Sequence, residues 1–348
     1  MPNTSPTLAS LDHGELAAPL DNAAIKARVL ELALPADQAL TDNLKSHVPF
    51  IEKVSCYIVF SGGKRLRPVL FTLAAHAAGA GGDPRLAKLS SIFEYLHAAT
   101  LLHDDVVDEA GLRRGRPAAR VKYGNDAVIL VGDFLFSKSY SLAAEVEDHR
   151  FVTALTDCTT HMAEGQVLEL IHTGDLALTP EGYLGVIVAK TAVLLAAACQ
   201  MGALLGRADQ AAVDALYDYG MELGIAFQMV DDALDYVGTE HEFGKPVGHD
   251  LAEGKITLPF IHARDHAEPQ VRSRLVQLAE EGKTRPEVLA EAKDIVRSLG
   301  GVEATYAQAR AHAFRAQAAL APLLAGREAS ADLQTLMGLP HYVLTRRS

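Results

Sequence analysis

The feature that most constrains this chain is a five-residue acidic pattern, DDxxD, which occurs at residues 104–108 and again at 231–235. Each copy lies within an apolar stretch of helical period, where a charged cluster is costly to bury unless it is paired or binds a metal. Residues i and i+4 of a helix share a face, so each copy directs its carboxylates toward one point. If the two helices face each other, one cleft is lined by Asp104, Asp105, Asp108, Asp231, Asp232 and Asp235.

Such a cluster of carboxylates requires cations. Two like charges about 4 Å apart repel each other by roughly 4 kcal/mol at an effective dielectric constant of about 20. Carboxylates without nearby cysteines or paired histidines suit a hard ion, and Mg2+ typically binds through a few carboxylates together with substrate phosphates. The pattern therefore predicts a metal-bound di- or triphosphate as the ligand. A single copy would fit a solvated acidic patch equally well, but a second copy in another apolar segment disfavours that interpretation.

The acidic balance of the chain limits its partners. With 348 residues and a formal net charge of −12, the protein lacks the basic face that nucleic-acid-binding proteins usually carry, so no nucleic acid is expected as a partner. A polyanionic substrate must then be bound by local cations or by metal. The three cysteines show no CxxC spacing, which is consistent with a reducing cytoplasm.

No segment of the sequence predicts export or membrane insertion. Residues 1–24 lack a basic region followed by an apolar core, so no signal peptide is expected. The most apolar run, residues 191–206, contains Gln200 and falls short of the roughly 20 residues needed to span a bilayer. We interpret this run as a buried helix. The lack of a basic amphipathic anchor also favours a soluble, cytoplasmic protein without stable membrane insertion.

Helical punctuation predicts an all-α fold. Long Ala/Leu-rich stretches alternate with short breaks rich in Gly, Pro and Asp. We expect residues 1–21 to be a mobile extension and residues 22–348 to form a single large helical bundle around a central cavity. The segment 238–254, with its four glycines, is either a solvated connector or a lid over the metal site. The expected helices are 22–34, 36–61, 68–79, 84–109, 125–145, 150–174, 179–206, 208–236, 257–267, 271–281, 286–299, 301–324 and 331–337.

Two basic loops supply candidate partners for phosphate groups. Residues 61–68 place three cations after a glycine pair, before a proline that can open a helix, and a helix start is a ready anion site. A second loop, residues 111–117, carries Arg113 and Arg114, which can each bind phosphate oxygens through two bonds. His97 lies two helical turns before the first acidic motif, on roughly the same face. We therefore expect two phosphate pockets, one rich in metal and one without metal.

Several ordered motifs extend from about residue 61 to residue 261. They are GGKRLRP at 62–68, EYLHAATLLH at 94–103, Arg113-Arg114, Gly165-Gln166, Lys190-Thr191, Phe227-Gln228, Gly254-Lys255 and Thr257-Leu258-Pro259. With these motifs and both DDxxD copies, the chain resembles the trans-isoprenyl diphosphate synthases of the polyprenyl synthetase family. The resemblance implies an isoprenoid synthase fold and a Mg2+-dependent condensation of isopentenyl diphosphate with an allylic diphosphate, namely geranyl, farnesyl or geranylgeranyl diphosphate.

The resemblance also implies roles for individual residues. Isopentenyl diphosphate would be bound by Lys64, Arg67, His97 and Arg114. The active site would hold three magnesium ions, two or more of them at the first motif. Their ligands would be Asp104, Asp108 and Asp231. Metal-bound water or neighbouring charge would be held by Asp105, Asp232 and Asp235, and these six carboxylates with Lys190 form the expected catalytic set. The allylic diphosphate would contact Arg113, Lys190, Lys245 and Lys255, with Thr191, Gln228 and, in support, Gln166 near its C1 carbon. The C-terminal pair Arg346-Arg347 resembles the basic tails that close over such sites in some members of the family.

The residues before the first acidic motif bear on product length. Ala99 and Thr100 are small, at positions where short-chain members of the family tend to place aromatic residues, so the growing chain should pass them. We expect the barrier that stops growth at Leu142 and Ala143 in the following helix. The expected product is octaprenyl to decaprenyl diphosphate, with decaprenyl favoured, of the kind used for a quinone side chain. Ordinary helix packing is the competing interpretation of Ala99 and Thr100.

Two other functions compete with this one. A terpene cyclase has an Asp-rich motif on an α-helical scaffold, but it has no need for a separate basic site at Lys64, Arg67 and His97. A non-catalytic subunit of a heteromeric synthase would be expected to carry degraded acidic motifs, whereas both are intact here. The resemblance and the apolar stripes within residues 125–145 and 150–174 favour a homodimer, although a buried core would give the same stripes.

Overall fold

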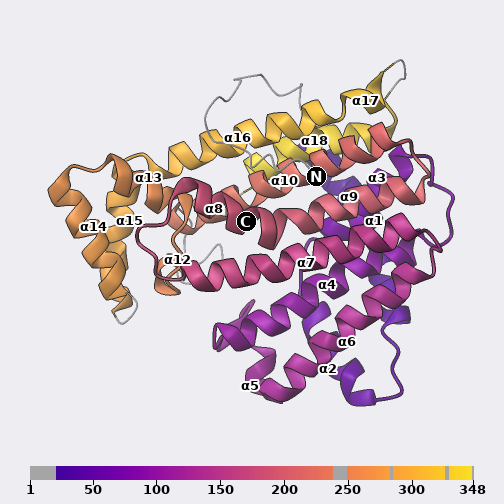
Figure 1. Ribbon diagram of the computed structural model, residues 1–348, viewed down its shortest axis with the longest axis horizontal. Helices are drawn as coiled ribbons and strands as arrows, with labels where there is room; N and C mark the ends of the chain where they lie inside the picture. The colour runs from indigo at the N-terminus through magenta and orange to yellow at the C-terminus, as the bar shows by residue number, and fades with distance from the viewer. Residues whose placement is uncertain (1–20, 238–248, 283–284, 326–328, 347–348) are drawn as a thin grey trace.

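The protein is built almost wholly from helices in the part of the chain that its computed structural model describes, residues 21–237, 249–282, 285–325 and 329–346 (Figure 1). The all-α prediction is therefore confirmed. The elements are α1 (Asn22–Asn43), α2 (Pro49–Val59), α3 (Leu66–Ala77), α4 (Leu86–Val107), β1 (Leu112–Arg113), β2 (Arg116–Pro117), α5 (Ala119–Tyr123), α6 (Asn125–Ala144), α7 (His149–His172), α8 (Pro180–Ile187), the π-helical turn η1 (Val188–Ala192), α9 (Val193–Leu205), α10 (Gln210–Val237), α12 (His249–Ala252), α13 (Leu258–His266), α14 (Pro269–Gly282), the 3-10 turn η2 (Pro286–Val288), α15 (Leu289–Ser298), α16 (Gly301–Ala319), α17 (Ala321–Leu324) and α18 (Ala331–Thr345).

The long helix α10 organises the packing of its neighbours. It packs along both α16 and α9, and apolar residues from α1 through α18 form one continuous buried cluster (Figure 1). A Cβ atom added at Gly224 of α10 would lie 2.6 Å from the Cα atom of Ala192, so only glycine permits this close approach. The first acidic motif lies at the C-terminal end of α4 and the second near the C-terminal end of α10. The tight packing around α10 thus fixes the second motif relative to η1.

The expected helix break at Pro35 is wrong. Helix α1 continues through Pro35 to Asn43, and the break falls at residues 44–48 instead. Pro35 lies on the exposed face of α1, as does Glu31, whose carbonyl oxygen loses its helical donor. Water can bind that oxygen, while the buried face of α1 continues without interruption through the proline. A proline therefore interrupts a helix less when its missing hydrogen bond lies on the solvent side.

Other helix boundaries also differ from the sequence-based expectation. The helix expected at 179–206 contains the π-helical turn η1, the last helix extends to Thr345 rather than ending at 337, and the helix expected at 301–324 is divided between α16 and α17. The short elements α5, α12 and the β1–β2 hairpin were not expected. Most of the expected extension, residues 1–20, and most of the expected connector or lid, residues 238–248, lie outside the described residues.

Two stretches are long and apolar enough to cross a membrane by length and composition alone, namely Asn125–Ala144 and Pro180–Leu205. The second extends over 26 residues, so the argument that the apolar run was too short for a bilayer does not hold. In the structure, however, 67% of its apolar window is buried inside the protein, and nearly all of α9 lies in the core. The expectation that residues 191–206 form a buried helix is therefore confirmed for α9.

Candidate active site

A cavity of about 610 Å³ brings the two acidic motifs together, with Asp104 of α4 and Asp231 of α10 both in its wall. A smaller adjacent cavity of about 200 Å³ contains Asp232. Three residues line both cavities, Lys190, Thr191 and Gln228. The two motif-bearing helices therefore face a shared space, as predicted. The expectation that all six carboxylates line one cleft is wrong, because Asp105, Asp108 and Asp235 line neither cavity.

The three carboxylates of the first motif point in different directions. Asp104 accepts a hydrogen bond from Gln166 and lies 3.6 Å from Lys190. Burial raises the pKa of Asp104, and the charge of Lys190 opposes that shift. Asp105 is fully buried and accepts a hydrogen bond from Nε of Arg113. It lines neither cavity, so its visible contact is with the hairpin arginine rather than with the shared space.

The second motif is held by a different set of donors. Arg346 donates to Asp231, and its guanidinium group also lies over the ring of Phe227. Asp232 is buried and accepts hydrogen bonds from the Tyr183 hydroxyl at 2.5 Å and from Gln228 at 2.8 Å. Burial raises the pKa of Asp232 to about 7. Asp235 accepts the backbone N–H groups of residues 249 and 250 at 3.2 Å, which ties the start of α12 to α10.

The larger cavity is lined by all four residues predicted to bind isopentenyl diphosphate, namely Lys64, Arg67, His97 and Arg114. Within the described part of the chain, the buried Nε atom of Arg67 has no hydrogen-bond partner. Burial, reinforced by the charges of Arg67 and Arg114, holds the pKa of His97 well below its usual value. This histidine is therefore neutral near pH 7, and the guanidinium groups of Arg67 and Arg114 beside it form a cationic cluster that suits an anionic ligand.

The π-helical turn η1 places Lys190 and Thr191 at the junction of the two cavities. A Cβ atom added at Gly165 of α7 would lie 2.6 Å from the backbone nitrogen of Lys190, so the glycine of the Gly165-Gln166 motif allows α7 to approach η1 closely. Thr191 donates a hydrogen bond of 3.1 Å to the side-chain oxygen of Gln228. Insertions of this kind are frequent at functional sites because they change the direction of side chains without ending the helix.

Two lysines compensate the acidic charge at the cavity wall. Lys190 pairs with Glu169 as well as with Asp104. Lys255 lies 3.5 Å from Asp108 and 2.7 Å from Glu253. Burial acts to lower the pKa of Lys255, but the carboxylates around it outweigh burial and raise it. Both lysines line the smaller cavity, where an anionic ligand would meet them.

The carboxylates fit a hard divalent cation by their chemistry. Among the described residues, no group of three or more His, Cys, Asp or Glu side chains lies close enough to hold a metal ion unaided. Burial raises the pKa of both Asp104 and Asp231, so each would be stabilised as an anion by a nearby cation. Because Mg2+ usually binds through one or two carboxylates together with substrate phosphates, a preassembled protein cage is not required. We conclude that the residues present suit such an ion.

The structure also contains site residues that the sequence analysis missed. Glu169 pairs with Lys190, Tyr183 bonds Asp232, and Glu94 pairs with Arg65 beside the basic cluster. Two of them carried a usable signal, since Glu169 follows Gln166 by three residues and therefore shares its helix face, and Glu94 opens the motif at 94–103. Lys245 and Arg347, which were predicted from the resemblance, lie outside the described residues.

The residues predicted to set product length are separated by the structure. Thr100 lines the larger cavity, and its hydroxyl donates to the carbonyl oxygen of His97. Ala99 is fully buried in the core, as are Leu142 and Ala143 of the adjacent helix α6. These three residues line neither of the two cavities. They belong to α4 and α6, two helices that pack directly against each other.

Comparison with known proteins agrees with this site. A family model described as polyprenyl synthetase matches residues 48–296. The chain is 38% identical over 310 residues to octaprenyl diphosphate synthase of Escherichia coli (strain K12), covering 88% of this chain and 94% of the relative. A polyprenyl synthase structure from Caulobacter crescentus CB15, complexed with calcium and isoprenyl diphosphate, has a TM-score of 0.85 and 36% identity and covers 95% of this chain and 100% of that one. A decaprenyl diphosphate synthase structure from Rhodobacter capsulatus has a TM-score of 0.85 and 38% identity, with coverage of 94% and 100%.

The chain belongs to the polyprenyl synthetase family. It is a prenyltransferase with the isoprenoid synthase fold, and more specifically a trans-polyprenyl diphosphate synthase. The family uses a divalent metal, and its substrates are isopentenyl diphosphate and an allylic diphosphate.

Proposed function

We propose that this chain is a long-chain trans-polyprenyl diphosphate synthase that adds isopentenyl diphosphate repeatedly to an allylic primer in a Mg2+-dependent reaction. The primer would be geranyl, farnesyl or geranylgeranyl diphosphate. The observation that carries this proposal is the single cavity that unites Asp104, Asp231 and the basic cluster around Arg67. A metal-rich pocket and a metal-free phosphate pocket can thus hold two diphosphates side by side.

In this proposal the basic cluster binds the diphosphate of isopentenyl diphosphate. The unpartnered Nε atom of Arg67 and the neutral imidazole of His97 offer directional donors, and Lys64 and Arg114 add charge. Hydrogen bonds between charged groups in a site with little water are stronger than they would be in bulk solvent. The cluster would therefore fix the position of the attacking double bond.

On the other side of the cavity, the allylic diphosphate would be bound by Arg113, Lys190 and Lys255, with Lys245 as a further candidate. Magnesium ions held by Asp104, Asp108 and Asp231, three per active site by our proposal, would stabilise the charge of the departing diphosphate. The side-chain oxygens of Thr191 and Gln228 would face the cationic C1 carbon, with Gln166 in support. No nucleophilic side chain is needed, because the double bond of isopentenyl diphosphate attacks and the released diphosphate accepts the proton.

The decisive experiment incubates the purified chain with Mg2+, isopentenyl diphosphate and each allylic primer in turn, and separates the products by chromatography. Chain elongation that requires both diphosphates is the expected result. Cyclised products from the allylic diphosphate alone would identify a terpene cyclase, and inactivity of the folded protein would favour a partner subunit. The second basic pocket argues against a cyclase, since a cyclase ionises a single diphosphate.

The product is proposed to be octaprenyl to decaprenyl diphosphate, with decaprenyl favoured, as for a quinone side chain. Small residues at 99 and 100 support this range, and the barrier is assigned to Leu142 and Ala143. We expect Ala99→Phe to shorten the main product, although filling a fully buried site also costs stability, typically about 1–3 kcal/mol. Chromatography of radiolabelled products gives the length distribution. An unchanged distribution from a folded variant would remove this assignment.

We further propose that the protein acts as a cytoplasmic homodimer. Large apolar side chains are exposed on α6 and α7, namely Ile129, Leu130, Val167, Leu170 and Ile171. Exposed apolar residues gathered on neighbouring helices are typical of a protein–protein interface. Light scattering coupled to size-exclusion chromatography tests the assembly, and Leu130→Lys or Ile171→Lys should then yield monomers. A wild-type monomer at micromolar concentration would exclude the dimer.

A further inference from the structure

Arg113 and Arg114, the candidate phosphate-binding pair, lie on a hairpin that is too small to hold itself in place. Each strand has two residues, paired as Leu112 with Pro117 and Arg113 with Arg116. Even longer isolated hairpins are only marginally stable in water. Arg114 and Gly115 form the connection, and both have positive φ angles, 51° and 72°, as a type I′ turn requires. The direction of the Arg114 side chain must therefore be fixed by contacts outside the hairpin.

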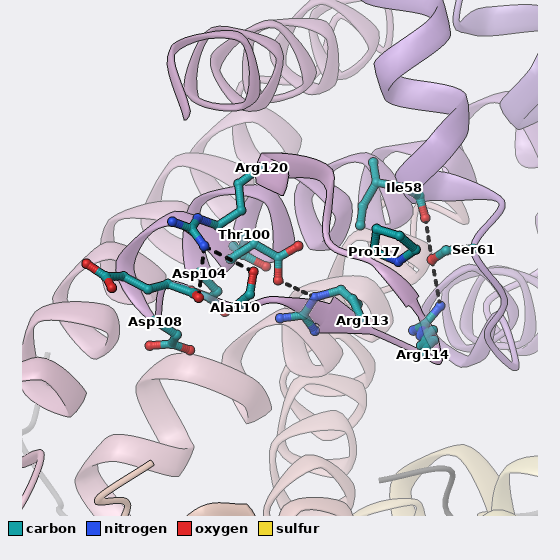
Figure 2. A network of polar contacts seen from close by, with 12 residues as sticks. Ile58, Ser61, Thr100, Asp104, Asp108, Ala110, Arg113, Arg114, Pro117 and Arg120 are labelled. Atoms are coloured by element: carbon teal, nitrogen blue, oxygen red, sulfur yellow. Dashed lines mark hydrogen bonds and ion pairs between the residues drawn. The ribbon is translucent and has the colours of Figure 1, made fainter. Parts of the chain in front are cut away.

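The first external contact comes from Arg120 of α5. Its Nη1 atom donates to the carbonyl oxygen of Glu109 at 2.9 Å and to that of Ala110 at 3.3 Å (Figure 2). These carbonyls belong to the loop that joins the first acidic motif to the hairpin, and Glu109 has a left-handed backbone with a φ of 49°. A cationic donor at the C-terminal end of a helix binds carbonyls that have no helical partner. Arg120 thus holds the entry to the hairpin.

The second external contact comes from Tyr57 of α2 and holds the exit from the hairpin. The Tyr57 hydroxyl donates a hydrogen bond of 2.7 Å to the carbonyl oxygen of Pro117. The tyrosine ring is itself held, because it packs edge-on against Tyr123 at 5.5 Å and lies 4.2 Å beneath the Lys122 ammonium group. The same helix leads into the loop of Ser61, whose hydroxyl accepts a long bond of 3.4 Å from Arg114 (Figure 2).

We propose that Tyr57 and Arg120 are positioning residues that aim Arg114 into the isopentenyl diphosphate pocket. Arg113 has its own link to α4 through Asp105, whereas the one side-chain hydrogen bond of Arg114 to another described residue is the long one to Ser61. Arg114 therefore depends on the hairpin for its position more than Arg113 does. This inference rests on the proposed function, because it takes the cluster around Arg67 as the isopentenyl diphosphate site.

The test measures binding of isopentenyl diphosphate by calorimetry, and steady-state kinetics for each substrate. Tyr57→Phe keeps the ring and removes one hydrogen bond, so we expect about a fivefold weaker affinity, equal to about 1 kcal/mol. Arg120→Ala should weaken the affinity about tenfold, because charged donors contribute more. The KM for isopentenyl diphosphate should rise in step, while kcat and the KM for the allylic primer change less than about twofold. Millimolar guanidinium chloride, compared with sodium chloride, should partly restore Arg120→Ala.

Matched controls separate positioning from general destabilisation. Tyr219→Phe removes a hydroxyl that also donates to a backbone carbonyl at 2.7 Å, and Arg274→Ala removes a surface guanidinium. Both should leave the affinity for isopentenyl diphosphate unchanged. Equal weakening by Tyr219→Phe would attribute the effect to stability and overturn the proposal.

Arg114→Ala distinguishes failure of this inference from failure of the proposed function. If Arg114→Ala leaves binding unchanged, the assignment of the pocket is wrong, and the inference falls with it. If Arg114→Ala weakens binding but Tyr57→Phe and Arg120→Ala do not, only the positioning proposal is overturned. In the Arg114→Ala background, Tyr57→Phe should add nothing, because it acts through the missing arginine. Additive losses in the double variant would contradict the proposal.

Discussion

The two acidic motifs have one pattern but different surroundings. In the first, the carboxylates pair mainly with cationic side chains, namely Asp104 with Lys190, Asp105 with Arg113 and Asp108 with Lys255. In the second, Asp231 meets the cation Arg346, Asp232 accepts hydrogen bonds from Tyr183 and Gln228, and Asp235 accepts the backbone N–H groups at the start of α12. The motifs are therefore not interchangeable halves of one site.

Helix geometry explains part of this difference. Helix α4 ends at Val107, so Asp108 follows the helix and its side chain is free to turn toward Lys255. Helix α10 continues to Val237, which keeps Asp232 and Asp235 on regular helix positions facing neighbouring elements. The carboxylates paired with side-chain cations in or near the cavities include Asp104, Asp108 and Asp231, the set that the family resemblance predicted as metal ligands. The same DDxxD motif thus directs different carboxylates toward the shared space in its two copies.

The largest expected effect comes from removing the carboxylate that faces the cavity in either motif. Asp104→Ala and Asp231→Ala should each lower kcat by about 100- to 1,000-fold, the usual cost of losing one group that stabilises transition-state charge. Circular dichroism must show that the variants stay folded. Asp214→Ala, an exposed aspartate on α10, serves as the control and should retain full activity. Activity of Asp104→Ala within about tenfold of wild type would argue against a metal role.

The next effect concerns ligand binding without turnover. Mg2+ alone should raise the melting temperature only slightly, because Lys190 and Arg346 already neutralise the cavity carboxylates. Mg2+ together with inorganic pyrophosphate at about 100 times its Kd should stabilise the fold by about 2.7 kcal/mol. Differential scanning fluorimetry measures both shifts. We expect Asp104→Asn to abolish the joint shift. A full shift with Mg2+ alone would mean that the site is preassembled.

A smaller effect is expected within the first motif at Asp105, which faces Arg113 rather than the cavity. Asp105→Asn removes the charge but keeps the shape, so Arg113 loses its ionic partner. Because Arg113 is partly exposed, with 22% of its side chain accessible, we expect a loss of about 1–3 kcal/mol of stability and about tenfold in turnover. Chemical denaturation and steady-state kinetics check these values. A loss as large as that of Asp104→Ala would show that all carboxylates of the motif act alike.

Residue patterns predicted the parts of the molecule that depend on periodicity. The helical period placed both acidic motifs on α4 and α10, and the residues of the predicted anion site that follow the glycine pair, Lys64 to Arg67, line the larger cavity. Where tertiary contacts decide the outcome, the patterns failed. Pro35 stays within α1 because its face is exposed, and the π-helical turn at Lys190 depends on the approach of Gly165 from another helix.

The hairpin anchors show the same limit in the candidate site. Tyr57 and Pro117 are 60 positions apart in the sequence, and no spacing rule connects a tyrosine hydroxyl with a carbonyl oxygen at that distance. The different partners of Asp104 and Asp105 could not be predicted either. Neighbouring positions on a helix point in different directions, and the sequence does not say which element lies in each direction. Local chemistry was predictable, whereas the partner of each charged group was not.

The smallest expected effect lies in the second motif, at the hydrogen bond between Tyr183 and Asp232. Among the described residues, Tyr183→Phe leaves Asp232 with Gln228 as its remaining side-chain donor, so the buried carboxyl loses a partner and the fold should lose about 1–3 kcal/mol of stability. Because Asp232 lies outside the larger cavity, turnover at saturating substrate should fall no more than about fivefold. Thermal denaturation and kcat measurements on Tyr183→Phe, with Tyr219→Phe as the control, test this pair of values. A turnover loss comparable to that of Asp231→Ala would show that Asp232 acts directly on the diphosphate, and the contrast between the two motifs would then disappear.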